Sequence, residues 1–281
     1  MLSSIVNFYS VSNTIKNSSR FFFSKTINKP LRKQEKEKKC EDRIIITHSK
    51  DLDLKDAVSS SLYQDWLNSI LETNFKLHSL HFQSLDMFGS RAGFVKFKSK
   101  ITLNGDSVPG IVFARGGSVA VLIKLISNET KEEYSVLTTQ PRVPIGKESF
   151  PEIPAGMLDG ESENFVGVAA KELEEETGIT ITKSQLIDLS GKAYSGKNSN
   201  GAIYPSPGGC DEFIKIYYYE RSLPNETILK MNKKITGNKL EREKITLKLI
   251  KFKDLWKETS DAKSLCAFLL YEKLLQDISR K

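Results

Sequence analysis

The sequence predicts an α/β or α+β sandwich, in which a mixed β-sheet lies between helices. The clearest strand is Val119–Ile126, a nearly continuous apolar run that suits the centre of a sheet. Two helices are expected: Glu163–Thr177, followed by a glycine suited to a left-handed cap, and the amphipathic segment Ala262–Ile278. Phe213–Tyr219 and Ile245–Phe252 alternate as strands between these helices.

The chain has 281 residues, of which 39% are hydrophobic and 27% charged, as is usual for a globular protein. No apolar stretch reaches the roughly 18 residues that a membrane span requires, so we expect no membrane partner. The cysteines form no CxxC pair and the histidines lack partners at ligand spacing, which argues against a disulfide framework or a zinc site. These residues are Cys40, Cys210, Cys266, His48, His78 and His81. His78 and His81 fall in a predicted strand, where we expect surface or hydrogen-bonded core side chains.

The first 34 residues predict a cleaved leader. They hold six basic side chains and no acid, and they are rich in Ser, Asn and Phe, which is the composition of an organellar transit peptide. The segment Arg20–Ser24 looks like a matrix-protease site, so we expect the mitochondrial matrix, with plastid and cytoplasm as alternatives. Of the formal charge of +7, only +1 remains for the rest of the chain. A nucleic-acid partner is therefore not expected.

Three segments follow from these patterns. Residues 1–34 are the leader, 35–109 comprise a charged linker and a β-rich subdomain, and 110–281 form the larger domain. Ala57–Leu71 has apolar residues at helical spacing and is predicted to be one short helix. From Phe75 onward, strand-like runs alternate with turn signals.

The helix Glu163–Thr177 is crowded with acids. On a helical wheel Glu172, Glu175 and Glu176 fall within an arc of roughly 100°, beside the apolar stripe, and Glu174 falls on the other side. The stripe consists of Val166, Ala169, Ala170 and Leu173. Like charges at this spacing destabilise a helix, and a divalent cation such as Mg²⁺ would offset their repulsion.

Gly156–Ile179 resembles the Nudix box, G-x5-E-x7-R-E-U-x-E-E-x-G-U, where U is apolar. Lys171-Glu172-Leu173 stands for R-E-U, Glu175-Glu176 for the paired acids, and Gly178-Ile179 for the end of the motif. The loop from Gly156 to Glu163 is one residue longer than the pattern, and Lys171 replaces an arginine that in this family orients a glutamate of the box. Lysine keeps the charge but loses the planar fork, which predicts some catalytic weakening.

Flanking motifs resemble those of the ADP-ribose and ADP-glucose pyrophosphatases, particularly the plant type. Gln140-Pro-Arg142 and Glu152-Ile-Pro-Ala-Gly156 are similar to the lead-in Q-x-R … E-L-P-A-G, and Ser206-Pro-Gly-Gly-Cys-Asp-Glu212 is similar to S-P-G-x-x-x-E. The resemblance covers roughly Gly110 to the C-terminus. It implies a Nudix sandwich and hydrolysis of an ADP-sugar to AMP and a sugar phosphate.

The resemblance also implies site residues. Glu172, Glu176, Glu175 and the Ala155 carbonyl would bind Mg²⁺, with Mn²⁺ as the alternative cation. Arg142 would bind a phosphate or the terminal sugar and Glu152 the nucleotide end. The remaining expected substrate-binding residues are Gln140, Ser206, Pro207 and Gly208. Glu175 is also expected to take part in catalysis, and the general base is either Glu212 or Glu243, with a slight preference for Glu243.

Members of this subfamily are commonly homodimers, so we expect a homodimer. Two alternatives remain. One is a Nudix hydrolase of NADH, a dinucleoside polyphosphate or another nucleoside diphosphate derivative. The other, for which Lys171 is the argument, is a Nudix module that binds nucleotides without hydrolysis.

Overall fold

The computed structural model describes residues 21–23, 44–158, 164–194, 196, 201–237 and 244–279. These fall into two compact units. The first unit comprises Met1–Arg115 together with Gly208–Asp211, and the second comprises Gly116–Pro207 and Glu212–Lys281. Of the predicted leader, Phe21–Phe23 form a strand (β1), and the rest lies outside the described residues. Within the described residues, no helix is long and apolar enough to span a membrane.

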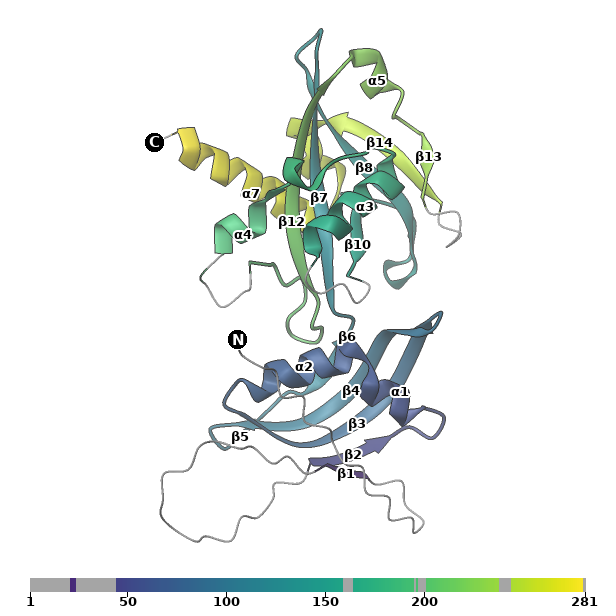
Figure 1. Cartoon of the computed structure of the whole chain (residues 1–281), viewed down its shortest axis with the longest axis vertical. Coiled ribbons are helices and arrows are strands. Elements are labelled where there is room, and N and C mark those ends of the chain that lie inside the picture. Colours follow the sequence, from purple (N-terminus) through teal and green to yellow (C-terminus); the bar gives the residue numbers. More distant parts are fainter. Residues whose placement is uncertain are drawn as a thin grey trace, which may run out of the picture. The chain divides into compact units, whose positions relative to one another are not determined.

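The first unit is a six-stranded sheet with two helices on one face (Figure 1). Its strands run in the order β1-β2-β3-β4-β5, with β6 also paired to β4. The elements after β1 are β2 (Ile44–His48), α1 (Leu54–Ser59), α2 (Ser61–Leu71), β3 (Phe75–Phe88), β4 (Arg91–Leu103), β5 (Asp106–Val108) and β6 (Ile111–Ala114). The core of this unit is aromatic, because Tyr63 of α2 packs against Phe82 and Phe97 of the sheet. His78 and His81 are partly buried, and each lies within 2.9 Å of a threonine hydroxyl.

The prediction of a single helix over Ala57–Leu71 is wrong, because the structure has two helices. Ser60 lies between them with an extended backbone (φ −63°, ψ 139°), and its hydroxyl accepts a hydrogen bond from the Tyr63 amide. Asp53 likewise caps the start of α1. Serine side chains compete in this way with helical backbone bonds, which ends one helix and starts the next.

The second unit contains an eight-stranded mixed sheet in the order β11-β12-β7-β8-β14-β13, with β10 paired to β7 and β9 paired to β8. The strands are β7 (Gly117–Ser127), β8 (Glu133–Arg142), β9 (Lys147–Glu152), β10 (Ala155–Met157), β11 (Ile187–Asp188), β12 (Phe213–Leu223), β13 (Ile235–Thr236) and β14 (Ile245–Lys251). The helices are α3 (Phe165–Thr177), α4 (Leu189–Tyr194), α5 (Asn225–Leu229), α6 (Leu255–Glu258) and α7 (Ala262–Ser279). Short 3-10 turns occupy Val143–Ile145, Lys183–Gln185 and Phe252–Asp254.

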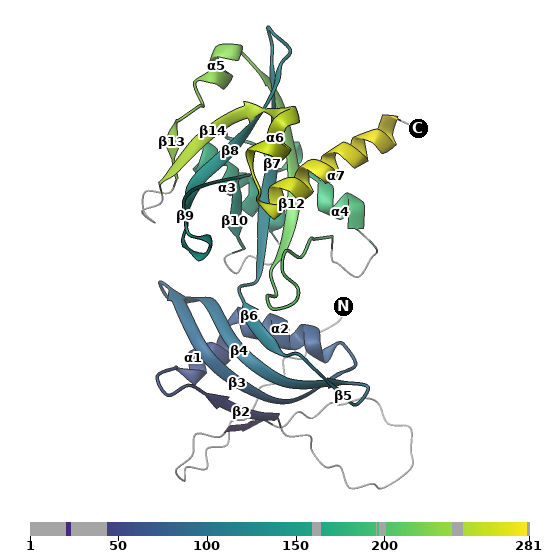
Figure 2. The same cartoon turned by 180° about the vertical axis from the view of Figure 1, so that it is seen from behind.

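Strand β7 shows why this sheet has helices on both faces. Its alternate residues Val119, Val121, Ile123 and Leu125 pack in the same core as α3, whereas Ala120 and Leu122 pack in a second core with α4, α6 and α7. Figure 2 shows α6 and α7 in front of the sheet and α3 behind it. Both faces are apolar, as a central strand buried on two sides requires. The predicted sandwich, with a mixed sheet between helices, is therefore confirmed.

Strands β7 and β8 pair with each other only at Leu125 and Ile126. Beyond these residues the two strands diverge, and β10 pairs with β7 while β9 pairs with β8. The turn between Glu152 and Ala155 connects β9 to β10 and so spans the gap between the diverging strands. The Val121 amide donates to the Pro154 carbonyl (2.9 Å) and fixes this turn. This arrangement places the predicted motif Glu152–Gly156 next to helix α3, since α3 contacts β10.

Candidate active site

Two acids of α3 reach the backbone of β10. The Ala155 amide donates to Glu176 Oε2 (3.0 Å), and only 2% of Glu176 is exposed. A Cβ atom placed on Gly156 would lie 2.0 Å from Cδ of Glu172, so the Glu172 carboxyl group occupies the space that any side chain at 156 would need. Because Glu172 and Glu176 are four residues apart on α3, both carboxylates arrive on the same helix face. The structure therefore places Glu172 and Glu176 against the backbone of Ala155 and Gly156.

The helix ends as its sequence indicates. Gly178 adopts a left-handed conformation (φ 74°), and its amide donates to the Glu174 carbonyl. Glu174 Oε1 accepts a hydrogen bond from the exposed Thr180 hydroxyl (2.9 Å), away from β10. The helix begins at Phe165, and Glu163 lies outside the described residues.

Glu175 has a different partner from its neighbours. Its Oε1 lies 3.8 Å from Nζ of Lys171, one turn earlier on the helix. The lysine that replaces the arginine of the Nudix pattern is therefore paired with the middle acid of the box. A single ammonium group holds that carboxylate less rigidly than a guanidinium fork can.

Strand β13 covers the last carbonyl groups of α3. The Gly237 amide donates to the Glu175 carbonyl (3.2 Å), and the Thr236 hydroxyl donates to the Glu176 carbonyl. The last carbonyls of a helix point beyond its final turn, and here Thr236 of β13 and Gly237 directly after it bind two of them. Glu243 lies outside the described residues; the residues on either side of the gap, Gly237 and Lys244, adjoin β13 and β14, which pair with each other.

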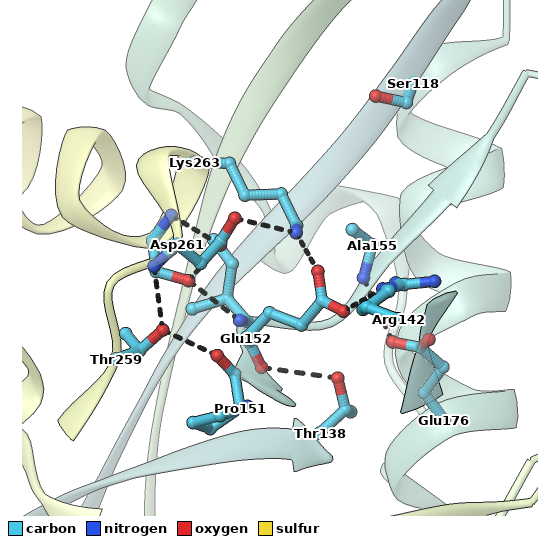
Figure 3. A network of polar contacts seen from close by, with 12 residues as sticks. Ser118, Thr138, Arg142, Pro151, Glu152, Ala155, Glu176, Thr259, Asp261 and Lys263 are labelled. Atoms are coloured by element: carbon cyan, nitrogen blue, oxygen red, sulfur yellow. Dashed lines mark hydrogen bonds and ion pairs between the residues drawn. The ribbon is translucent and has the colours of Figure 1, made fainter. Parts of the chain in front are cut away.

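Glu152 is buried between two cations (Figure 3). Its Oε1 lies 2.5 Å from Nε of Arg142, and its Oε2 accepts a hydrogen bond from Nζ of Lys263, on α7. Only 3% of Glu152 is exposed. Both carboxylate oxygens are therefore engaged by the protein, and Glu152 holds Arg142 in place rather than presenting a free acceptor.

The start of α7 supports this pair. Lys263 Nζ also lies 3.1 Å from Asp261, whose other carboxylate oxygen accepts bonds from the amide and hydroxyl of Ser264. The Ser264 hydroxyl in turn accepts from the Ile153 amide (3.0 Å), next to Glu152 in the chain. The helix start and the β9–β10 turn thus form one network of hydrogen bonds (Figure 3). No sequence motif predicts the contact between Lys263 and Glu152, because 111 residues separate them.

The other predicted substrate-binding residues lie on two elements. Gln140 lies in β8 and pairs with Phe150 of β9. A β-bulge follows it, after which Arg142 pairs with Lys147. Ser206, Pro207 and Gly208 are exposed and precede β12; Gly208 belongs to the first unit and the other two to the second.

Glu212, one candidate for the general base, stands just before β12. The Ser118 hydroxyl donates to its Oε1 (3.5 Å). By the alternation of the strand, Glu212 points to the same face as Ile214 and Ile216, which pack in the core with α7. That face of the sheet is opposite to the one that α3 covers.

The donor set on α3 and β10 fits a hard cation. Within the described residues no group of three or more His, Cys, Asp or Glu side chains is gathered as a metal site. Glu172, Glu176 and the Ala155 carbonyl nevertheless offer only oxygen, and Mg²⁺ is usually held by one or two carboxylates with water and substrate phosphates completing its shell. The residues present therefore fit Mg²⁺ better than zinc, which prefers nitrogen and sulfur ligands.

The fold, the acid helix and its approach to Ala155–Gly156 define a class of protein. The model of the NUDIX domain matches residues 117–266, and the chain belongs to the Nudix hydrolase family. Over 229 residues the chain is 44% identical to Nudix hydrolase 14, chloroplastic, of Arabidopsis thaliana, covering 78% of this chain and 72% of that protein.

Two solved structures are similar at lower identity. The crystal structure of an ADP compounds hydrolase is 15% identical, with a TM-score of 0.48, and covers 74% of this chain and 98% of its own. A Caenorhabditis elegans (C. elegans) Ap4A hydrolase in a binary complex is 16% identical, with a TM-score of 0.39, and covers 57% of this chain and 98% of its own.

Proposed function

We propose that this Nudix hydrolase is a Mg²⁺-dependent ADP-sugar diphosphatase that splits ADP-ribose or ADP-glucose into AMP and a sugar phosphate. The observation that carries the diphosphate chemistry is the convergence of Glu172 and Glu176 on the backbone of Ala155 and Gly156. The preference for an ADP-sugar rests on the motifs Gln140-Pro-Arg142 and Ser206-Pro-Gly208, which resemble those of the ADP-sugar pyrophosphatases.

Each residue has a defined task in this proposal. Glu172, Glu176 and the Ala155 carbonyl would hold Mg²⁺ or Mn²⁺, with Glu175 as a further carboxylate for the cation. The bound cation neutralises phosphoryl charge and lowers the pKa of a coordinated water. Arg142, fixed by Glu152, binds a phosphate oxygen or the distal sugar with the part of its guanidinium that Glu152 leaves available.

We assign Glu152 a different role from the one that the sequence suggested. A carboxylate with both oxygens bound to Arg142 and Lys263 contacts the nucleotide end poorly. Glu152 therefore contributes to substrate binding through Arg142, whose orientation it sets.

For the general base, Glu243 is preferred to Glu212. Glu212 points to the sheet face opposite α3, whereas the residue before the segment 238–243, Gly237, is bonded to the carbonyl of Glu175. Glu243→Gln should therefore lower kcat strongly and Glu212→Gln only weakly. The reverse order would transfer the role to Glu212.

Two features of the biological setting follow from the relatives. The Arabidopsis protein is named as chloroplastic, and a leader with basic residues and no acids suits a plastid as well as a mitochondrion, so we propose the plastid. The mitochondrial expectation has no support from this relative. We also propose a homodimer, which light scattering behind size-exclusion chromatography tests directly.

The substrate proposal is tested on the full chain with Mg²⁺ by following AMP release from ADP-ribose, ADP-glucose, NADH and diadenosine tetraphosphate. Glu176→Gln should abolish the release. Glu174→Gln is the matched control, because this acid lies on the same helix but binds the exposed Thr180. Preferential turnover of NADH or the dinucleoside would refute the ADP-sugar proposal, and nucleotide binding without any turnover would favour the non-catalytic module.

A further inference from the structure

The hydroxyl group of Ser264, in the first turn of α7, is buried and bonded on two sides. It donates to Asp261 Oδ2 (2.5 Å) and accepts from the Ile153 amide (3.0 Å). Because its hydrogen is directed to Asp261, a lone pair of the oxygen is left for the amide. Ser264 and Ile153 are both 0% exposed, so this bond is made in the core of the second unit.

Ile153 and Pro154 form the turn between β9 and β10. Proline has no amide hydrogen, so Ile153 carries the only N–H group of this turn. A buried N–H group without an acceptor is costly, and Ser264 supplies that acceptor. The turn is therefore fixed at one amide by Ser264 and at one carbonyl, that of Pro154, by the Val121 amide.

The strand register shows where the backbone of Ala155 points. Ala155 pairs with Ala120, and the flanking Val121 amide donates to the Pro154 carbonyl. In an antiparallel ladder this pattern makes Ala155 and Ala120 a non-hydrogen-bonded pair, whose own N–H and C=O groups point away from the partner strand. The Ala155 amide accordingly donates to Glu176 Oε2 (3.0 Å). The Ala155 carbonyl leaves β10 on the same side.

A backbone carbonyl cannot be adjusted by a rotamer change, so its position depends on the chain before it. The Pro154 ring fixes one backbone dihedral directly before Ala155. Ile153 precedes a proline, which restricts its backbone to extended conformations. A displacement of the Ile153 amide is therefore transmitted along a stiff segment to the Ala155 carbonyl.

Resting on the function proposed above, we infer that Ser264 is a positioning residue for the divalent cation. Its hydroxyl fixes the Ile153 amide and so sets the position of the Ala155 carbonyl, the backbone ligand of the proposed site. This task differs from that of the neighbouring Lys263, which acts on Arg142 through Glu152. Helix α7 thereby supports the cation site and the substrate-binding arginine through adjacent residues.

A second serine offers a matched control. Ser190, in α4, is also 0% exposed, and its hydroxyl accepts from the Ile216 amide (3.0 Å) and lies 3.2 Å from Asp188 Oδ1. The bonding pattern is that of Ser264, but Ile216 lies in β12 rather than in the turn before Ala155. Ser190→Ala thus removes an equivalent buried bond outside the proposed cation site.

The experiment compares Ser264→Ala, Ser264→Thr and Ser190→Ala in the full chain. The readouts are the Kd for Mn²⁺, measured by electron paramagnetic resonance of the free ion, the Mg²⁺ concentration that gives half-maximal AMP release, and the midpoint of thermal unfolding. Removing a group that orients a metal ligand typically weakens metal binding by about 10–100-fold. Because Ser264 acts through the backbone, we expect the lower end, about tenfold, for both metal readouts in Ser264→Ala.

The other variants separate this effect from a loss of stability. Ser190→Ala should lower the unfolding midpoint about as much as Ser264→Ala while its Kd for Mn²⁺ stays within about twofold of the wild type. Ser264→Thr keeps the hydroxyl and should keep the Mn²⁺ affinity. Saturating Mg²⁺ should return kcat of Ser264→Ala towards the wild-type value, which a general loss of structure would not allow.

Hydrogen exchange in the wild-type chain provides a test that requires no variant to fold. If the bond from Ile153 to Ser264 favours cation binding, the cation must stabilise that bond in turn. Mg²⁺ should therefore slow exchange of the Ile153 amide more than exchange of the Ile216 amide, which Ser190 holds.

The inference is overturned if the wild-type chain binds no Mn²⁺, or if Ser264→Ala binds Mn²⁺ as tightly as the wild type. It is also overturned if Ser190→Ala weakens Mn²⁺ binding equally, or if Mg²⁺ slows exchange of both amides to the same extent. A wild-type chain that binds Mn²⁺ but releases no AMP would instead refute the proposed function. This outcome is distinct because the comparison of Mn²⁺ affinities does not depend on turnover.

Discussion

Replacing Lys263 by methionine tests whether the buried contact between α7 and β9 stabilises the second unit and orients Arg142. Methionine keeps most of the aliphatic stem and removes the ammonium group. Glu152 is 3% exposed, and the side chain of Lys263 is 12% exposed. The change therefore leaves a buried carboxylate with Arg142 as its remaining cation within this network.

The expected cost follows from the burial of the pair. Removing one partner of a buried ion pair destabilises proteins by about 3–5 kcal/mol. Because Arg142 still neutralises Glu152, we expect a smaller cost than this range, about 2–3 kcal/mol. At about 2–4 °C per kcal/mol for a domain of this size, the unfolding midpoint should fall by roughly 4–12 °C.

The assay is thermal unfolding together with the KM for the ADP-sugar, which should rise as Arg142 loses its fixed position. Lys257→Met is a matched control: its ammonium group pairs with Asp254 at 3.2 Å, but 56% of its side chain is exposed. Surface pairs of this kind contribute about 0–1 kcal/mol. Combining Lys263→Met with Glu152→Gln should cost less than the sum of the two single changes. An unfolding midpoint for Lys263→Met within 1 °C of the wild type would refute the reasoning.

Three further changes have definite outcomes. Gly156→Ala should abolish AMP release while the chain still folds, because the new methyl group displaces the Glu172 carboxylate; circular dichroism separates this result from misfolding, and full activity would contradict the geometry. Ser60→Ala should cost about 1 kcal/mol, measured by urea unfolding, because the start of α2 loses its cap; no change in the transition would show that the cap is dispensable. Burial raises the pKa of the Cys266 thiol, so less of the reactive thiolate forms in the folded chain than in the unfolded chain. Iodoacetamide should therefore alkylate Cys266 more slowly in the folded chain until the pH exceeds the ordinary thiol range. Equal alkylation rates for the folded and unfolded chains at pH 8 would disprove this.

The local features of the second unit were predictable from the sequence, because they depend on neighbouring residues. The apolar run Val119–Ile126 lies in the central strand β7, and the acid helix ends at Gly178 with the expected left-handed cap. The residues of the Nudix box also have a fixed spacing, so the sequence alone places Glu172 and Glu176 on one helix face. The structure adds the backbone that this face meets.

Two kinds of feature were not predictable. Long-range contacts, such as Lys263 with Glu152, leave no periodic signal, because each residue is ordinary in its own segment. Competition between local structures is the second kind: the apolar spacing of Ala57–Leu71 fits one helix, yet the hydroxyl of Ser60 stabilises a break. In the second case a single side-chain hydrogen bond outweighs the pattern of the surrounding residues.

The return of Gly208–Asp211 to the first unit also bears on how such a chain can evolve. A module that is connected to the rest at one point can be exchanged by a single recombination event. Here the polypeptide changes units after Arg115, after Pro207 and after Asp211, so a cut at any one of these points leaves the other links in place. Fusing Gly116–Lys281 to a foreign N-terminal module would remove the amides of Phe113 and Arg115 that hold the segment. The two units are therefore expected to be inherited together.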